Sequence, residues 1–496
     1  MSLYNTLDSS VLTRPGQYYL TDINLISYRS GTDDSEPDKI GIDSLVAEVN
    51  IYESIYNKTL SGNLFVVDTQ NIVGKLPLTG NERLGFKLYT PSSPFGYDFS
   101  EKSGHPMYIY KITNRVATGP RSQAYIIHFC SKEMIDNETA SVASAMNTSY
   151  DLMVADITKN PYYLGSNKNF YYEPAIGLNK FVFGRNKPFD CIDKLSKNTI
   201  SSKFHNAGYY FYETSRGFNY KSLESMLAVE SNTARPAAAR FRPKPANISD
   251  GRGEKDIRNE MQIAIDYKVS DQFDQLKNLR NGVYANKLIT HDQFYKTITE
   301  QNFNYEDEYG KMFHTETDRT GSKETEKGIL PKYVRNGKSL SEYPDGTIYV
   351  HSNTQNIYGS NIETPDPHNI LQRRLSQRSA FATFKLTLTV NGFTGIQAGD
   401  IITYEHPSYE SKVAGEQNDN DIYLSGRYLV TTVRHQINQA NKKHLMVLEC
   451  HKDSVRRPYP QEINDTFIGR EKIEEGIIDI YEFDKILYGG LSTSFK

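Results

Sequence analysis

The sequence predicts a mainly β, multi-domain protein of the α+β type. Small or apolar residues fall at every second position in several short segments, as in Ala47, Val49 and Ile51, so that one face of a strand can pack inward. The chain contains 36 Tyr and 23 Phe but no Trp, and Tyr favours half-buried strands and interfaces. With 496 residues, the chain is long enough for roughly three or four domains.

The first predicted domain follows an N-terminal arm. We expect the arm at residues 1–43 and a tube-like antiparallel β-barrel at residues 44–135. Alternating patterns predict strands at residues 45–51, 60–67, 83–89, 108–116 and 123–131. The last two strands flank Thr118-Gly119-Pro120, a strong turn signal.

A small α/β domain is expected at residues 136–205. Residues 132–145 could form a helix that leads into it. After Pro188, the apolar residues Phe189, Ile192 and Leu195 lie three apart, which predicts a short amphipathic helix with proline near its start.

The second tube-like β-barrel is predicted to combine residues 206–233 with residues 380–452. A hairpin is expected around Ser215-Arg216-Gly217, with strands at residues 209–213 and 218–220. Further strands are predicted at residues 384–390, 401–404, 428–437 and 445–449.

Residues 234–379 are predicted to form an inserted, loop-rich α+β domain, and residues 453–496 a C-terminal extension. The Pro- and Arg-rich stretch 234–246 is typical of an exposed linker, and the alternative is a polybasic contact with an acidic partner. A strand is expected at residues 263–269. Ser270 then caps a helix that ends at Gly282.

Two stretches of the chain match each other. Gly80-Asn-Glu, Tyr110-Lys-Ile-Thr and Phe129-Cys-Ser-Lys correspond to Gly399-Asp, Tyr428-Leu-Val-Thr and Glu449-Cys-His-Lys, at offsets of 319, 318 and 320 residues. The nearly constant offset predicts a duplicated β-domain, with chance similarity of strands as the alternative. In each copy, Gly followed by Asn or Asp tolerates positive φ and predicts a turn before a strand.

Charge and cysteine usage exclude several classes of protein. The 57 Lys and Arg residues nearly balance the 60 Asp and Glu residues, whereas a protein that grips nucleic acid usually carries a basic excess. Three distant cysteines argue against a disulfide framework and fit a reducing cytoplasm. The first ten residues show no signal-peptide pattern, and no apolar run is long enough to predict a membrane span.

The sequence carries no motif that assigns a catalytic, cofactor-binding or metal-binding residue. There is no P-loop, no Gly-x-Ser-x-Gly motif and no zinc-ligand spacing, so we expect no cofactor and no enzyme activity. His435, His444 and His451 lie close in sequence and could be metal ligands, but we interpret them as polar strand residues. A peptidoglycan-degrading enzyme stays an alternative, because carboxylate pairs are abundant.

Four tyrosines suggest a second alternative. Tyr162, Tyr163, Tyr171 and Tyr172 could stack on sugars, as in a glycan-binding protein. We favour subunit contacts instead, because Tyr is enriched at protein interfaces.

Several stretches, taken in order, resemble the central baseplate hub proteins of contractile-tailed phages and, more distantly, the hub part of type VI secretion spike proteins. The resemblance covers most of residues 44–452 and rests on stretches 53–68, 80–82, 183–189, 211–224, 281–288 and 426–435. The polar insertion at residues 300–378 and the extension after residue 453 depart from the shortest members of that family.

The resemblance implies a structural role in the virion. Such hubs have two related β-barrels and form homotrimers that present a pseudo-sixfold ring to the tail tube. They carry the central spike on the opposite face, contact other baseplate proteins and let DNA pass through their lumen. On this basis we expect assembly in the host cytoplasm, no membrane insertion, and a lumen lined by neutral or acidic side chains, since a basic lining would retain DNA.

Overall fold

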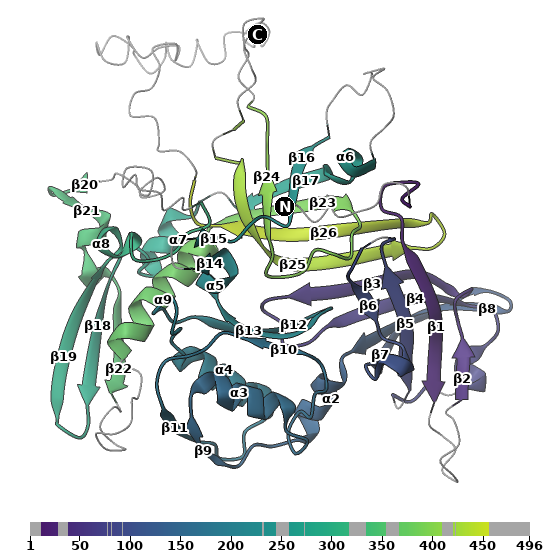
Figure 1. Cartoon of the computed structure of the whole chain (residues 1–496), viewed down its shortest axis with the longest axis horizontal. Helices are drawn as coiled ribbons and strands as arrows, with labels where there is room; N and C mark the ends of the chain where they lie inside the picture. The colour runs from purple at the N-terminus through teal and green to yellow at the C-terminus, as the bar shows by residue number, and fades with distance from the viewer. Residues whose placement is uncertain are drawn as a thin grey trace, which may run out of the picture. The chain divides into compact units, whose positions relative to one another are not determined.

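The computed structural model describes residues 11–27, 38–76, 78–80, 82–91, 93–230, 233–244, 257–271, 273–316, 334–353, 367–408, 420–421 and 423–455. Strands dominate this part of the chain and form one 14-stranded sheet and several small sheets (Figure 1), which confirms the predicted mainly β fold. No helix among these residues has the length and apolar character needed to cross a membrane. The extension predicted at residues 453–496 lies outside the described residues from residue 456 onward, as do stretches 317–333 and 354–366 of the insertion.

The first part of the large sheet is antiparallel throughout. Its elements are β1 (Tyr19–Ser27), β2 (Asp38–Gly41), β3 (Val46–Ser54), β4 (Ser61–Asp68), α1 (Ile72–Lys75), β5 (Arg83–Tyr89), β6 (Gly96–Asp98), η2 (Glu101–Ser103), β7 (Met107–Gly119) and β8 (Ser122–Cys130). The strand order is β2-β1-β5-β7-β8-β4-β3, with β6 added to β5. Strands β1 and β2 lie within the predicted arm, but they join this sheet because Ile23 and Leu25 are buried in its core.

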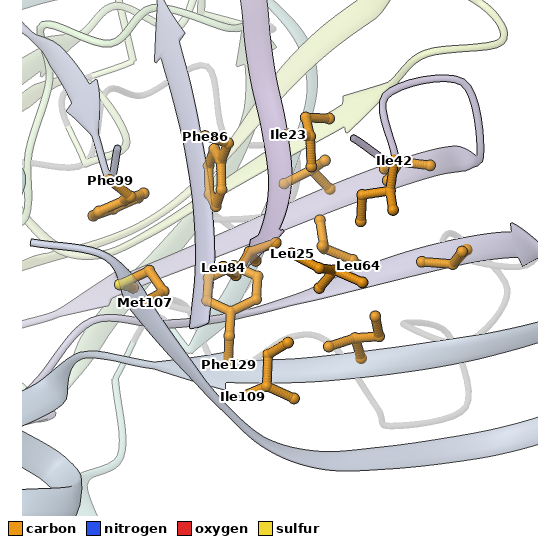
Figure 2. Close-up of a cluster of buried hydrophobic side chains, with 14 of the residues drawn as sticks. Ile23, Leu25, Ile42, Leu64, Leu84, Phe86, Phe99, Met107, Ile109 and Phe129 are labelled. Atoms are coloured by element: carbon orange, nitrogen blue, oxygen red, sulfur yellow. The ribbon is translucent and has the colours of Figure 1, made fainter. Parts of the chain in front are cut away.

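An aromatic and aliphatic core fills this part of the sheet. Figure 2 shows Leu25 of β1, Leu64 of β4 and Phe86 of β5 gathered around Phe129 of β8. The Phe86 and Phe129 rings meet edge to face, with their centroids 5.8 Å apart. Inward residues at every second position therefore supply the core, as the alternation predicted.

The second part of the sheet closes into a six-stranded barrel. Its strands are β16 (Ala239–Pro243), β17 (Ile263–Asp271), β23 (Phe384–Asn391), β24 (Ile401–Tyr404), β25 (Gly426–Asn438) and β26 (Lys443–Lys452). They follow the order β25-β24-β16-β17-β23-β26, and β26 pairs back to β25. The Pro- and Arg-rich stretch predicted as a linker therefore contains a barrel strand, in which Ala239 and Phe241 are buried between exposed arginines.

The two parts repeat one topology, as the matched stretches predicted. In chain order, β3, β4, β5, β7 and β8 correspond to β17, β23, β24, β25 and β26. In both parts the spatial order is third, fourth, fifth, second and first strand, with antiparallel neighbours. Before the third strand, Gly80 and Gly399 have φ of 96° and 89°, which confirms the predicted turns.

A carboxylate stabilises each of these turns in the same way. Glu82 accepts the backbone N–H of Thr79 at 3.0 Å, and Asp400 accepts that of Gln397 at 3.1 Å. The turn is therefore conserved between the two parts in its hydrogen bonding as well as in its backbone.

The residues that the sequence match pairs, in contrast, are not the ones that occupy equivalent positions in the two parts. Ile109 faces Phe129 and Val430 faces Cys450, so equivalent residues differ by 321 positions (430 − 109 and 450 − 129). The sequence match instead paired Cys130 with Cys450, one residue out of register, and Tyr110 with Tyr428, three residues out. Because a shift of one residue moves a side chain to the other face of a strand, Phe129 is the counterpart of Cys450.

A small α/β unit follows the first part. It contains α2 (Lys132–Thr139), β9 (Ala145–Thr148), α3 (Tyr150–Lys159), β10 (Phe170–Tyr172), β11 (Asn179–Val182), α4 (Pro188–Asn198), β12 (Tyr209–Thr214) and β13 (Gly217–Ser222). Helix α4 and the β12–β13 hairpin are where the sequence predicted them. The hairpin pairs with β10 in a separate three-stranded sheet, although residues 206–233 were predicted to join the second barrel. Helix α2 ends earlier than predicted, at Thr139.

The remaining elements lie mostly in the predicted insertion. They are α5 (Leu223–Leu227), β14 (Ala228–Glu230), β15 (Thr233–Ala234), α6 (Ile257–Met261), α7 (Gln275–Arg280), β18 (Ala285–Asp292), β19 (Thr297–Asn304), α8 (Tyr305–Tyr309), β20 (Val334–Arg335), β21 (Lys338–Ser339), η4 (Leu340–Glu342), η5 (Pro344–Gly346), β22 (Ile348–Asn353) and α9 (Pro367–Phe381). Ser270 lies within β17 and therefore does not cap α7, contrary to the prediction from the sequence. Asp274 is the capping residue instead, because its side chain accepts the N–H of Lys277 at 2.9 Å. The division of the chain into domains stays a prediction.

Candidate assembly interface

The two repeats are joined by strand pairing within the chain. One edge of β25 pairs first with β24, at residues 426–429, and then with β3 of the first repeat. The second contact is antiparallel and runs from Thr432 opposite Ser54 to Asn438 opposite Glu48. In Figure 1, β3 lies in the purple part of the chain and β25 in the yellow part. The junction therefore merges two repeats into one sheet.

Polar side chains fix the register of this junction. Arg434 donates from Nε to the side-chain oxygen of Asn50 at 3.0 Å, and Gln436 donates to Glu48 at 3.2 Å. The Ser54 and Thr432 hydroxyls lie 3.1 Å apart. Such cross-strand pairs stabilise sheets and favour one register.

The corresponding edge of β7 is open. Strand β7 pairs with β5 through Met107 and Tyr108, and the Ile109 N–H donates to the Glu82 carbonyl at 3.2 Å. No other described strand pairs with that edge at residues 110–119. Tyr110 and Val116 are 51% and 60% exposed, whereas Thr431, which corresponds to Tyr110 at the offset of 321 residues, is fully buried. An open strand edge presents a row of backbone donors and acceptors that can pair with another strand.

The strand that corresponds to β3 is β17, and it too has an exposed edge. On the side away from β23, β17 pairs with β16 at Ile263 and Ala264. No further described strand pairs there with Asp266 or with residues 268–270, and Ile265 is 45% exposed. Both strands of the internal junction therefore have a counterpart with an uncovered edge. No described strand covers the edge of β7 that corresponds to the paired edge of β25, or the edge of β17 that corresponds to the paired edge of β3.

A buried carboxylate connects the first repeat to its surroundings. Glu53 of β3 accepts hydrogen bonds from the Tyr97 hydroxyl at 2.6 Å, the Ser215 N–H at 2.9 Å and the Ala398 N–H at 3.2 Å. These donors belong to β6, to the β12–β13 turn and to the loop before β24. Burial raises the pKa of Glu53 to about 7, although the three hydrogen bonds oppose that rise.

A second buried network joins the first repeat to the small α/β unit. The Lys168 ammonium lies 2.8 Å from Glu133 and 2.6 Å from Glu213, and all three side chains are almost fully buried. The second carboxylate oxygen of Glu213 accepts the Leu60 N–H at 2.9 Å. Burial raises the pKa of Glu213, and the nearby Lys168 charge only partly offsets that rise. At Glu133, in contrast, the attraction of Lys168 and the hydrogen bonds outweigh burial, so its pKa is lowered.

The three histidines considered as metal ligands do not come together as one site. His435 and His444 lie side by side in the interior, with Nδ1 of the first 3.0 Å from Nε2 of the second, whereas His451 contacts Thr431 at 2.9 Å. Burial lowers the pKa of His435 to about 3 and that of His444 well below its ordinary value, so both rings are neutral. No group of three or more His, Cys, Asp or Glu side chains in the described part of the chain could hold a metal ion.

The four tyrosines lie on two elements. Tyr162 and Tyr163 follow α3, where Tyr162 is 87% exposed and Tyr163 donates to the Ser144 hydroxyl at 3.3 Å. Tyr171 and Tyr172 lie on β10 and are about half exposed. Their predicted role at subunit contacts stays a prediction.

Sequence reasoning missed the residues that hold the units together. Glu53, Glu133 and Lys168 are separated by long stretches of sequence, and each looks like an ordinary surface charge. A partial signal existed for Glu53, since it stands next to the inward-facing alternation of β3, where a charge needs a buried partner. Their partners could be identified only from the fold.

Comparisons with known proteins give the following similarities. The sequence matches no protein-family model and no curated protein. Among solved structures, the chain is similar to a tail protein from Neisseria meningitidis MC58 (10% identity, 90% of this chain and all of the other, TM-score 0.47). It is also similar to the 43 kDa tail protein of prophage MuSo2 from Shewanella oneidensis (10% identity, 88% and 100% covered, TM-score 0.44). A third is an E. coli type VI secretion component with structural similarity to T4 tail proteins gp27 and gp5 (7% identity, 90% and 79% covered, TM-score 0.38).

Proposed function

We propose that the chain is a structural baseplate hub of a contractile phage tail and acts as a trimeric adaptor without enzyme activity. The observation that carries this proposal is the strand junction between the two repeats. One junction is made inside the chain by β25 and β3, and its counterpart strands, β7 and β17, keep their equivalent edges uncovered.

The uncovered edges fit each other by analogy with the internal junction. Strand β7 corresponds to β25, and β17 corresponds to β3. If β7 of one copy pairs with β17 of a second copy, the contact between chains repeats the contact within the chain. If the copies join head to tail, with β7 of each copy on β17 of the next, the contact is heterologous, and its repetition produces a closed ring or an open filament.

Three chains in a closed ring would supply six similar repeats. Such a ring has threefold symmetry in its chains and near-sixfold symmetry in its sheets. It could therefore contact a sixfold tail-tube ring on one face and a threefold central spike on the other, with further baseplate proteins outside. Pairing β7 with β17 at every join would satisfy the backbone groups of both uncovered edges, which favours a stable assembly.

The proposed setting is the virion, after assembly in the host cytoplasm, with DNA passing through the central channel. We do not propose specific DNA binding, since the 57 basic residues of the chain are balanced by 60 acidic residues.

The test measures both the mass of the assembly and the contact between β7 of one chain and β17 of the next. Light scattering of the purified chain is expected to give three times 56.6 kDa, and a larger complex once tube and spike proteins are added. In a mixture of Thr113→Cys chains and Ser270→Cys chains, oxidation is expected to link one kind to the other. Thr113 corresponds to Arg434 of the internal junction, and Ser270, at a bulge of β17, lies next to Asp271, the counterpart of the Tyr52 that pairs with Arg434. The native cysteines are all buried and should not interfere.

A matched control uses a cysteine in the same strand but out of reach. Asp266→Cys lies four residues from Ser270, about 13 Å along the strand, and should not link to Thr113→Cys. A chain that stays monomeric with its tail partners would refute the hub. Trimers in which Ser270→Cys and Asp266→Cys link equally, or not at all, would refute the β7–β17 contact while leaving the trimer.

A further inference from the structure

A basic cleft lies outside the strand junctions, between the segment after β3, helix α4 with β12, and helix α9. Its volume is about 370 Å³. Four cationic side chains and one anionic side chain line it, namely Lys58, Lys197, Arg374, Arg378 and Asp193. The chain as a whole carries a formal charge of −3, so this concentration of positive charge is local.

The only carboxylate of the cleft among the described residues is already neutralised. Asp193 forms an ion pair with Lys58. Arg374 donates to the backbone carbonyl of Lys197, a neutral acceptor. No described carboxylate forms an ion pair with Arg374, Arg378 or Lys197, which leaves three positive charges in the cleft uncompensated.

The two guanidinium groups are placed as a pair. Arg374 and Arg378 are four residues apart in α9, so they project from one face of the helix about one turn apart. Burial and the charge of Arg378 both lower the pKa of Arg374. Arg374 is half-buried while Arg378 is exposed, so the pair reaches from inside the cleft to its mouth. A ligand with two negative groups would relieve this repulsion, and guanidinium forks bind carboxylates in two-pronged fashion.

The rest of the lining indicates which kind of anion fits. Tyr56 and Tyr210 meet edge to face, with ring centroids 6.1 Å apart, and Ile55 and Leu375 add aliphatic surface. A nucleic-acid strand is better matched by an extended basic stripe than by a confined cleft with apolar walls. Mixed cationic and apolar walls suit a peptide that carries both acidic and apolar side chains.

We propose that this cleft binds a carboxylate-rich peptide segment of a partner protein. Arg374 and Arg378 hold two carboxylates of the segment, Lys197 adds to the attraction, and the tyrosine pair packs against an apolar side chain between them. The site is separate from the β7 and β17 edges, so its occupancy does not depend on the proposed trimer.

The test uses the full chain and a short fluorescein-labelled peptide in which Glu alternates with Leu. Fluorescence anisotropy at low ionic strength, about 0.05 M, is expected to show binding that added salt weakens. The same peptide with Gln in place of Glu is expected to bind about tenfold more weakly or less. A labelled single-stranded oligonucleotide of equal charge is the competing probe.

Variants of the chain locate the site. Arg378→Gln alone, and with Arg374→Gln, is expected to weaken peptide binding by about tenfold or more. Arg378 is exposed, so its single substitution leaves the packing of α9 intact. The control Lys194→Gln with Arg373→Gln removes the same charge nearby, from an exposed residue of α4 and from an arginine of α9 paired with Glu308. Absence of peptide binding, equal losses in control and test variants, or tighter binding of the oligonucleotide would each overturn the proposal.

Discussion

At the scale of single residues, Glu53 makes stability depend on pH. Its pKa in the folded chain is about 7, above the ordinary value of 4.5, so the folded state holds the proton more tightly than the unfolded state does. The stability from this group is present at low pH and is lost as pH rises from about 4.5 to 7. The shift corresponds to about 3 kcal/mol at most.

Glu53→Gln should therefore flatten this dependence. Between pH 5 and pH 8, melting of the wild-type chain is expected to shift to lower temperature by more than that of the variant, whose side chain does not ionise. Thermal unfolding followed by circular dichroism at both pH values measures the difference. Equal shifts in the two proteins would show that Glu53 does not ionise in this range.

The ion network around Lys168 gives a second prediction at this scale. Lys168→Met would leave the carboxylates of Glu133 and Glu213 buried without their cation, and we expect a loss of about 3–5 kcal/mol in the free energy of unfolding. The exposed pair of Lys187 with Glu138 is the control, since solvent screens its charges and Lys187→Met should destabilise the fold far less. Urea unfolding compares the two variants, and similar losses would contradict the assigned role of burial.

At the scale of elements, strand β4 depends on a glycine where β8 crosses close by. A Cβ atom at Gly62 would lie 2.3 Å from the Phe129 ring and 2.4 Å from the carbonyl oxygen of Asn50. Gly62→Ala must displace the core ring or the β3–β4 pairing, and we expect a loss of about 2 kcal/mol or more. At Gly184 the same Cβ meets no atom within 4 Å, so Gly184→Ala should be close to neutral. Denaturant melts of both variants test the contrast.

Individual strands and turns also show which features of the fold could be predicted from the sequence. The alternation of apolar and polar residues along the sequence identified most barrel strands, and the turns at Gly80 and Gly399 helped to identify the repeat. Both signals lie within a few consecutive residues, so they can be read without knowing the fold. Strand β16 was missed because only Ala239 and Phe241 face inward among arginines and prolines, and that pattern is also typical of linkers. The sheet of the β12–β13 hairpin was predicted wrongly, since its partner β10 is three residues long and leaves almost no pattern. The junction could not be predicted, since pairing between β3 and β25 depends on contacts more than 370 residues apart, such as the 378 that separate Ser54 and Thr432.

At the scale of the whole molecule, the large sheet is one element that two repeats build together. Closing the second barrel leaves β25 with an edge longer than β24 can cover, and β3 covers the rest. The first repeat has the same excess in β7, with no described strand to cover it. A single chain therefore contains one satisfied and one unsatisfied copy of the same join, and association with further copies is the direct way to satisfy the second.

Ring closure can be separated from filament growth with one doubly substituted chain. A chain carrying both Thr113→Cys and Ser270→Cys can link to a neighbour on each side, so oxidation should give a ladder of covalent species on a denaturing gel. In a closed ring of three, the ladder ends at the trimer, because every edge is then used. An open filament would continue to larger species as oxidation proceeds, and a ring of another size would end the ladder at its own chain number. A reciprocal twofold dimer would end the ladder at two chains, and only a ladder that ends at three agrees with six repeats around one channel.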